Sequence, residues 1–251
     1  SRTVPFVAKA TGVPLAKVAA RVMAGATLAE LRGEGLLRDP VRGGHVSVKE
    51  AVLPFNRFPD VDSVLGPEMR STGEVMGIDV TFGLAFAKSQ IAAGSRLPEE
   101  GGVFLSLADR DKEAGVVAAR RFVELGFSIV ATSGTAAFFE ARGIPVAEIV
   151  GKLDGEGEGH ERVDPSGPTT TAIDLITAGK VALVINTPRG SGPRADGHYI
   201  RAAAQAHSVP CLTTVAAALA AVGGIADWST HELRVRSLQE FHAAEQLGLD
   251  L

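Results

Sequence analysis

The sequence predicts an α/β protein, in which a mainly helical N-terminal segment precedes a doubly wound parallel sheet. Beyond residue 102, short apolar runs of strand length alternate with stretches whose apolar residues recur at helical spacing. Such alternation is typical of parallel strands joined by helices on both faces of one sheet. The polar residues 98–102, which include Pro98, Gly101 and Gly102, separate this part from the preceding one. We therefore predict two domains, residues 1–97 and residues 98–251.

The N-terminal segment is expected to contain helices with an irregular middle. Residues 14–23 have apolar side chains at helical spacing and end before Gly25. Thr27 and Glu30 form a capping-box pattern that predicts the start of a second helix. Residues 46–48 and 51–53 predict two short strand pieces, stopped by Pro54. A further helix is expected from Thr81 to about residue 94.

The second part supplies the elements of the predicted sheet. Residues 181–185 are apolar throughout, as a central parallel strand should be. The remaining strands are expected at residues 103–105, 127–131, 145–150 and 210–213. The helices are expected from residue 111 to the turn at 126, and at residues 136–141, 172–176, 202–206 and 215–221.

Composition excludes several classes of function. The chain has 251 residues, of which 45% are hydrophobic and 22% charged, as in an ordinary globular protein. No apolar run approaches the ~20 residues that cross a bilayer, so no membrane partner is expected. The second part is acidic, which argues against generic nucleic-acid binding. A single cysteine and six histidines without metal-ligand spacing predict no disulfide and no metal site, and a cytoplasmic location.

Polar residues follow three of the predicted strands, at the edge where ligands of doubly wound sheets bind. These residues are Ser106, with Lys112 a few residues further on; the run Thr132, Ser133, Gly134 and Thr135; and the pair Asn186 and Thr187. A hydroxyl-rich turn before a helix can hold a phosphate at the positive end of the helix dipole, and Lys112 and Lys152 would supply cations. The alternatives are an ordinary helix cap, a solvated lysine and ordinary turn chemistry.

Three stretches of the sequence carry a resemblance to a known family. They are residues 2–17 (RTVPFVAKATGVPLAK), 47–55 (SVKEAVLPF) and 65–77 (LGPEMRSTGEVMG). All three resemble the end of the second ATP-grasp module of carbamoyl-phosphate synthase large chains. The part after residue 97 is similar to the methylglyoxal-synthase-like regulatory domain that ends those chains. The resemblance covers nearly the whole sequence, and it implies a C-terminal fragment of such a large chain.

The resemblance implies roles for individual residues. Arg2 matches a catalytic arginine that binds the phosphorylated intermediate, and Glu50 matches a residue at the junction between the domains. The positions that match the family's nucleotide monophosphate site are Ser106, Lys112, Thr132, Thr135, Lys152, Asn186 and Thr187. The implied effector is UMP, or less commonly IMP.

The resemblance also implies the activity of the whole enzyme. That enzyme makes carbamoyl phosphate from bicarbonate, glutamine-derived ammonia and two ATP, for arginine and pyrimidine biosynthesis. ATP with Mg or Mn would serve the full-length enzyme, and a glutaminase small chain and the rest of the large chain would be partners. The fragment alone is expected to hold no cofactor and to be non-catalytic.

Three departures from the family pattern bear on the effector. Cys211 and Leu212 stand where ornithine-binding members have a Tyr-Asp pair, so we expect no ornithine activation. Pro188 replaces a threonine often used on the nucleotide, and the loop after Lys152 is longer and richer in Gly and Glu. Two alternatives remain open: a methylglyoxal-synthase-like phosphate-lyase, for which Asp111 is present but the usual Gly-Gly-Asp stretch is not, and a purely structural docking domain.

Overall fold

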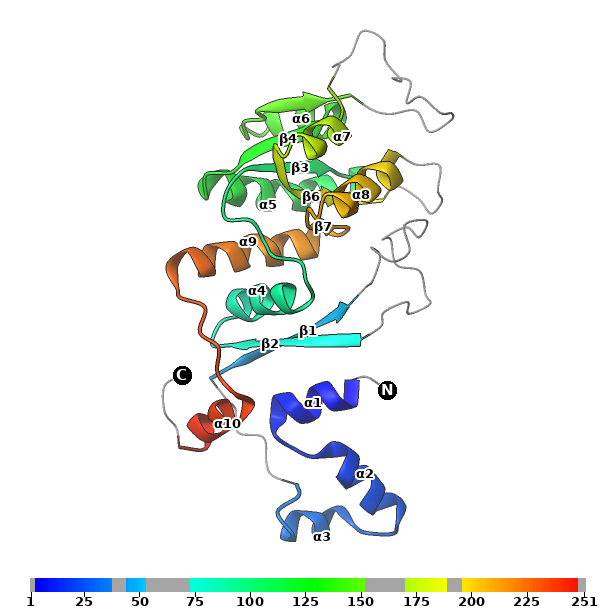
Figure 1. Ribbon diagram of the computed structural model, residues 1–251, viewed down its shortest axis with the longest axis vertical. Coiled ribbons are helices and arrows are strands. Elements are labelled where there is room, and N and C mark those ends of the chain that lie inside the picture. Colours follow the sequence, from blue (N-terminus) through cyan, green and yellow to red (C-terminus); the bar gives the residue numbers. More distant parts are fainter. Residues whose placement is uncertain (1–2, 38–43, 53–72, 152–169, 189–195, 248–251) are drawn as a thin grey trace.

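Figure 1 shows the computed structural model, which describes residues 3–37, 44–52, 73–151, 170–188 and 196–247. The molecule is arranged in layers along one long axis. A five-stranded sheet with its helices lies at one end, and two further helices, a two-stranded sheet and a helical region follow towards the other end (Figure 1). The predicted α/β class, with a mainly helical N-terminal segment, is confirmed.

The five-stranded sheet is entirely parallel, and its strand order is β5-β4-β3-β6-β7. The chain starts at the middle strand, builds two strands to one side and then two to the other. This order creates a switch point between β3 and β6, where the direction of winding reverses. The strands are β3 (Gly102–Ser106), β4 (Ser128–Thr132), β5 (Glu148–Val150), β6 (Val181–Asn186) and β7 (Cys211–Leu212).

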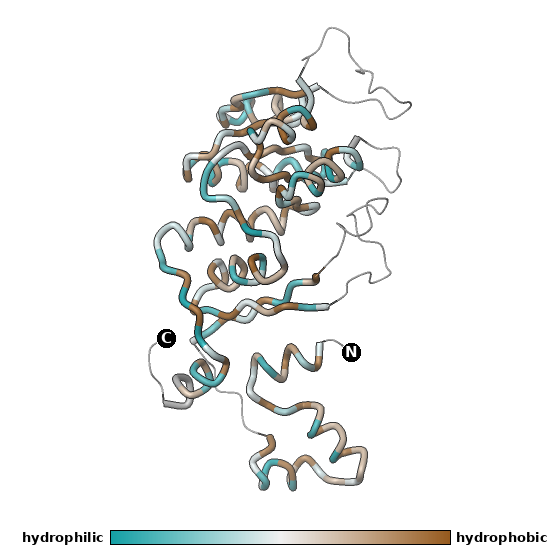
Figure 2. The backbone as a smooth tube through the Cα atoms, viewed as in Figure 1, coloured by the Kyte–Doolittle hydropathy of each residue, from teal (hydrophilic) through white to brown (hydrophobic). Residues whose placement is uncertain are grey.

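Helices cover both faces of this sheet. Successive side chains of a strand point to opposite faces, and apolar side chains on both faces must be covered. On β3, Val103 and Leu105 belong to one hydrophobic cluster, and Phe104 between them belongs to the other. The first cluster includes residues of α5 (Lys112–Glu124), α6 (Ser133–Glu140) and α9 (Val215–Thr230). The second includes residues of α7 (Ala172–Thr177) and α8 (Asp196–Ala206). Figure 2 shows the apolar segments concentrated in these strands and in α9.

The N-terminal part consists of three helices and an antiparallel pair of strands. The helices are α1 (Thr3–Thr11), α2 (Leu15–Met23) and α3 (Leu28–Gly33), and the strands are β1 (Val46–Val52) and β2 (Gly73–Asp79). The capping box of Thr27 and Glu30 is confirmed at the start of α3. The two predicted strand pieces form one continuous strand, β1, and its partner β2 was not predicted.

Helix α4 (Phe82–Ala92) connects the two parts by packing. It begins after Thr81, as predicted, and it lies between the β1–β2 sheet and α9 (Figure 1). Its residues Phe86 and Ala87 share the first hydrophobic cluster with the five-stranded sheet, and so does Leu97. The predicted division at residues 97 and 98 stays a prediction, but the core is continuous across it.

The chain beyond α9 returns to the N-terminal part. An extended segment leads to α10 (Leu238–Leu247), a helix that was not predicted, which lies beside α1 (Figure 1). The His242 Nε2 atom lies 2.8 Å from the Lys9 carbonyl oxygen of α1. Phe241 of α10 is buried. The C-terminal end of the described chain is therefore fastened to its N-terminal helix.

Candidate functional site

Most of the predicted binding residues meet at the carboxyl edge of the parallel sheet. Ser106 ends β3 and lies opposite Asn186, which ends the neighbouring strand β6. Thr132 ends β4 on the other side of β3. These strand ends flank the switch point, the position at which ligands of doubly wound folds bind.

Two threonines after the strand ends hold the loop that follows β3. The Thr135 hydroxyl accepts a hydrogen bond from the Leu107 amide at 3.1 Å and another from the Thr132 hydroxyl at 3.2 Å. The Thr187 hydroxyl accepts from the Ala108 amide at 2.7 Å. All three threonines are buried, and buried polar groups of this kind require such partners. Their hydroxyls therefore first shape the loop at residues 107–108, a role that the sequence did not reveal.

Lys112 places a cation beside the start of α6. Its side chain is 11% exposed, and its ammonium forms an ion pair with Asp109 at 2.7 Å. A Cβ atom placed on Gly134, in the first turn of α6, would lie 3.7 Å from the Lys112 Nζ atom. The ammonium and the amide groups of this helix start thus form one electropositive corner at the edge of the sheet. Asp109 is 84% exposed, so its carboxylate occupies this corner from the solvent side.

Arg201 is part of this edge and was not predicted from the sequence. It lies on α8, is buried, and donates from Nη1 to the Asn186 Oδ1 atom at 2.6 Å. The available signal was a single arginine directly before the predicted helix at residues 202–206, which begins with a run of alanines. Its partner lies 15 residues earlier in the chain, so only the fold brings the two side chains together.

Two predicted site residues, Arg2 and Lys152, lie outside the described residues. Of those described, Ser106, Lys112, Thr132, Thr135, Asn186 and Thr187 gather around the carboxyl edge. That gathering matches the predicted placement, and their roles in binding stay predictions.

Glu50 lies elsewhere, on β1, and its side chain contacts α4. The Gln90 side-chain amide of α4 donates to the Glu50 carboxylate at 2.9 Å. Burial raises the pKa of the Glu50 carboxyl, and hydrogen bonds from the Ala51 amide and from Gln90 oppose that rise. Since α4 packs on α9, Glu50 is one helix away from the α/β part, which agrees with a position near the junction.

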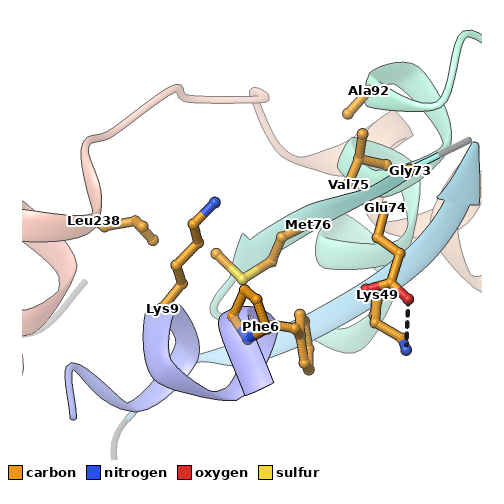
Figure 3. A pocket seen from close by; sticks show the side chains of 10 residues that line it. Phe6, Lys9, Lys49, Gly73, Glu74, Val75, Met76, Ala92 and Leu238 are labelled. Atoms are coloured by element: carbon orange, nitrogen blue, oxygen red, sulfur yellow. Dashed lines mark hydrogen bonds and ion pairs between the residues drawn. The ribbon is translucent and has the colours of Figure 1, made fainter. Parts of the chain in front are cut away.

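A pocket of about 560 Å³ lies between α1 and the β1–β2 sheet. Figure 3 shows Phe6 and Lys9 of α1 facing Met76 of β2, with Leu238 of α10 at one side. The ion pair between Lys49 and Glu74, at 3.2 Å, forms part of its wall. None of the predicted site residues that the structure describes lines it, so it is separate from the described part of the carboxyl edge.

Two searches of the described residues bear on other kinds of site. No group of three or more His, Cys, Asp and Glu side chains suited to a metal ion occurs among them. No helix in the described ranges is long and apolar enough to span a membrane.

The fold and its edge define a class of protein. Residues 115–213 match the family model of the MGS-like domain, and this range runs from α5 to the end of β7 and just beyond. The chain therefore contains an MGS-like domain built on the five-stranded parallel sheet.

More specific relatives are found among curated proteins. A carbamoyl phosphate synthase large chain of Mycobacterium tuberculosis (strain H37Rv) is 53% identical over 254 residues, covering 96% of this chain and 22% of that protein. The large chain of Streptomyces avermitilis is 53% identical over 252 residues, with the same coverage. The large chain of Streptomyces coelicolor is 52% identical over 255 residues, covering 97% of this chain and 22% of that protein.

This chain is homologous to carbamoyl phosphate synthase large chains and matches their C-terminal part. The predicted resemblance to these large chains and to their MGS-like domain is thus confirmed. The chain spans 22% of the length of the curated relatives it matches.

Proposed function

We propose that this chain is the regulatory C-terminal part of a glutamine-dependent carbamoyl phosphate synthase large chain. Its MGS-like domain binds a nucleoside monophosphate, UMP in preference to IMP, at the carboxyl edge of the parallel sheet. The observation that carries this proposal is the Lys112 ammonium beside the first turn of α6, at the switch point. A helix start with an adjacent cation is a ready site for a phosphate dianion.

The geometry supports different roles for the residues of the site: some bind the phosphate, and others hold the loop after β3. The phosphate displaces the exposed Asp109 carboxylate from Lys112 and accepts from the backbone amides of the exposed residues Ser133 and Gly134. The loop at residues 107–108 is held in place by the hydroxyls of Thr132, Thr135 and Thr187. Ser106 and Asn186 then line the neighbouring part of the edge, nearer the sugar, and the predicted Lys152 adds a second cation.

The reaction that this domain would regulate belongs to the whole enzyme. It forms carbamoyl phosphate from bicarbonate, glutamine-derived ammonia and two ATP in the cytoplasm, with Arg2 at the second ATP-grasp site. ATP and Mg²⁺ or Mn²⁺ are assigned to the rest of the large chain, and ammonia to a glutaminase small chain. The present chain alone is not expected to catalyse bicarbonate-dependent ATP hydrolysis.

Calorimetric titration of the chain with UMP, IMP and inorganic phosphate tests the proposed site. The wild-type chain is expected to bind UMP more tightly than IMP, and Lys112→Met is expected to weaken UMP binding at least about tenfold. Lys180→Met is the matched control, because Lys180 is exposed on the loop between α7 and β6. A folded wild-type chain that binds neither nucleotide would refute the proposal.

The two alternatives make different predictions, one for nucleotide binding and the other for an activity assay. A lyase would need a carboxylate base near the phosphate, but the Asp111 carboxylate faces the Arg110 guanidinium at 3.6 Å. Release of methylglyoxal from dihydroxyacetone phosphate would support that alternative. A purely structural domain would bind no nucleotide, and its loss would change only subunit assembly.

A further inference from the structure

The buried Arg201 guanidinium fixes the orientation of a side chain at the carboxyl edge. Arg201 is 4% exposed, and its Nη1 atom donates to Asn186 Oδ1 at 2.6 Å. A guanidinium has only donors, so it can be satisfied only by the oxygen end of an amide. The two ends of the Asn186 amide are therefore not interchangeable here. The oxygen faces Arg201, and the two Nδ2 hydrogens face elsewhere.

The backbone of α8 is adapted to this pair. A Cβ atom on Gly197, in the first turn of α8, would lie 2.5 Å from Arg201 Nη1 and 2.7 Å from Asn186 Oδ1. Both distances are shorter than those that real Cβ atoms adopt, so a larger residue would displace the Arg201 guanidinium, the Asn186 amide or the helix start. Ile200 and Ala204 of the same helix are buried against the sheet, which holds α8 in this position.

We propose that Arg201 is a positioning residue that presents the Nδ2 donors of Asn186 to an acceptor oxygen of the ligand. The inference rests on the proposed nucleotide site and deepens it. It assigns to the β6 end of that site a donor that selects ligands bearing a phosphate, hydroxyl or carbonyl oxygen there. Arg201 acts through Asn186 and does not need to touch the ligand itself.

Asn186→Asp separates this role from a merely structural one. The substitution keeps an oxygen acceptor for Arg201, so the fold is expected to survive with an unfolding midpoint no lower than that of the wild type. It also replaces the only donors of the side chain with a carboxylate oxygen. An oxygen facing a ligand oxygen repels it, so UMP binding is expected to weaken about a hundredfold or more.

A double-mutant cycle tests whether Arg201 acts through Asn186. Alone, Arg201→Met and Asn186→Ala should each weaken UMP binding about tenfold, because each removes the correctly oriented donor. In the Asn186→Ala background, Arg201→Met should cost no further affinity. Arg201→Lys, which still donates to Oδ1, should recover part of the loss and serves as the conservative variant if the methionine variant unfolds.

The decisive measurement is calorimetric titration of the full chain with UMP, with circular dichroism to verify folding of every variant. Wild-type affinity in Asn186→Asp, or equal losses from Arg201→Met in both backgrounds, would overturn the inference while leaving the nucleotide site intact. If the wild-type chain binds none of UMP, IMP and inorganic phosphate, the proposed function fails first, and this inference falls with it.

Discussion

The contact between α4 and α9 gives a sharp test of how the two parts of the chain are joined. Helices α4 and α9 lie side by side (Figure 1), and Gly83, the second residue of α4, lies close to Gly223 and Asp227 of α9. A Cβ atom there would lie 2.3 Å from the Asp227 Oδ2 atom and 2.7 Å from the Gly223 carbonyl oxygen. The same Asp227 oxygen accepts a hydrogen bond from the Thr81 hydroxyl at 2.6 Å. Gly83→Ala therefore forces the helices apart at the point where Thr81 joins them.

The size of the effect follows from these distances. The Gly223 carbonyl belongs to the backbone, so α9 must retreat from 2.7 Å to the 3.4 Å of an ordinary contact, a shift of about 0.7 Å. A gap of that size loses a substantial part of the dispersion energy across the interface. Overpacking of this kind costs about 1–3 kcal/mol, and the better helix propensity of alanine returns at most ~1 kcal/mol. The net expectation is a loss of about 1–2 kcal/mol, or roughly 2–8 °C in Tm.

Urea unfolding followed by circular dichroism measures this loss, and Gly223→Ala provides the matched control. Gly223 lies in the interior of α9, where an added Cβ atom would meet nothing within 4 Å. The control substitution should stabilise the chain by about 0.5–1 kcal/mol through helix propensity alone. Gly83→Ala with wild-type stability or better would show that α4 and α9 are not in close contact in solution.

Three other perturbations have defined outcomes. Burial raises the pKa of Glu50 above its ordinary 4.5, so the folded chain keeps this proton longer than the unfolded chain, and stability falls as pH rises through that raised pKa. Glu50→Gln should thus be more stable than the wild type at pH 7, with the difference vanishing in acid below about pH 4; unfolding midpoints across pH measure it. Lys88→Met removes the ammonium that pairs with Asp79 at 2.6 Å and donates to the Arg234 carbonyl. It should cost about 1–3 kcal/mol and raise hydrogen exchange in residues 238–243; unchanged exchange there would contradict it. Asp109→Ala removes the exposed partner of Lys112 and should tighten UMP and phosphate binding about two- to fivefold in calorimetry.

The location of the candidate site followed from the sequence because it depends on local patterns. Alternating strands and helices of the observed lengths leave few topologies open, and parallel strands present all their carboxyl ends at one edge. Ser106, Thr132 and Asn186 could therefore be assigned to one edge without knowledge of the strand order. The strand order itself, with β3 in the middle, required the structure.

The roles of the threonines and of Arg201 could not be predicted in this way. The sequence pattern is the same whether a hydroxyl after a strand binds a ligand or accepts a hydrogen bond from a backbone amide. The choice depends on whether an amide such as that of Leu107 or Ala108 lies within reach. In the sequence, Arg201 is a single arginine directly before the predicted helix at residues 202–206, and no motif marks it. Its burial depends on Gly197, which lets α8 approach Asn186 closely. The distance between α8 and Asn186 cannot be predicted from the local sequence.

The end of α9 was misplaced for a related physical reason. The predicted helix stopped at residue 221, just before Gly223 and Gly224, because glycines weaken helices. The helix continues to Thr230, and Gly224 lies in its interior. A Cβ atom on Gly224 would lie 3.1 Å from the Gly83 carbonyl oxygen of α4. The close packing that this glycine permits offsets its poor propensity, so what resembles a helix terminator in the sequence is a helix contact.

The contact between α4 and α9 also explains why the polar residues 98–102 do not separate two independent hydrophobic cores. Residues 98–102 are polar, but Leu97 immediately before them is buried in the first hydrophobic cluster. Helix α4 is buried on both sides, with β1 and β2 on one and α9 on the other. Helix α9 starts directly after β7, at the carboxyl edge, and its far end is tied to Thr81 through Asp227. Through these contacts α9, α4 and the β1–β2 sheet that carries Glu50 form one continuously packed unit.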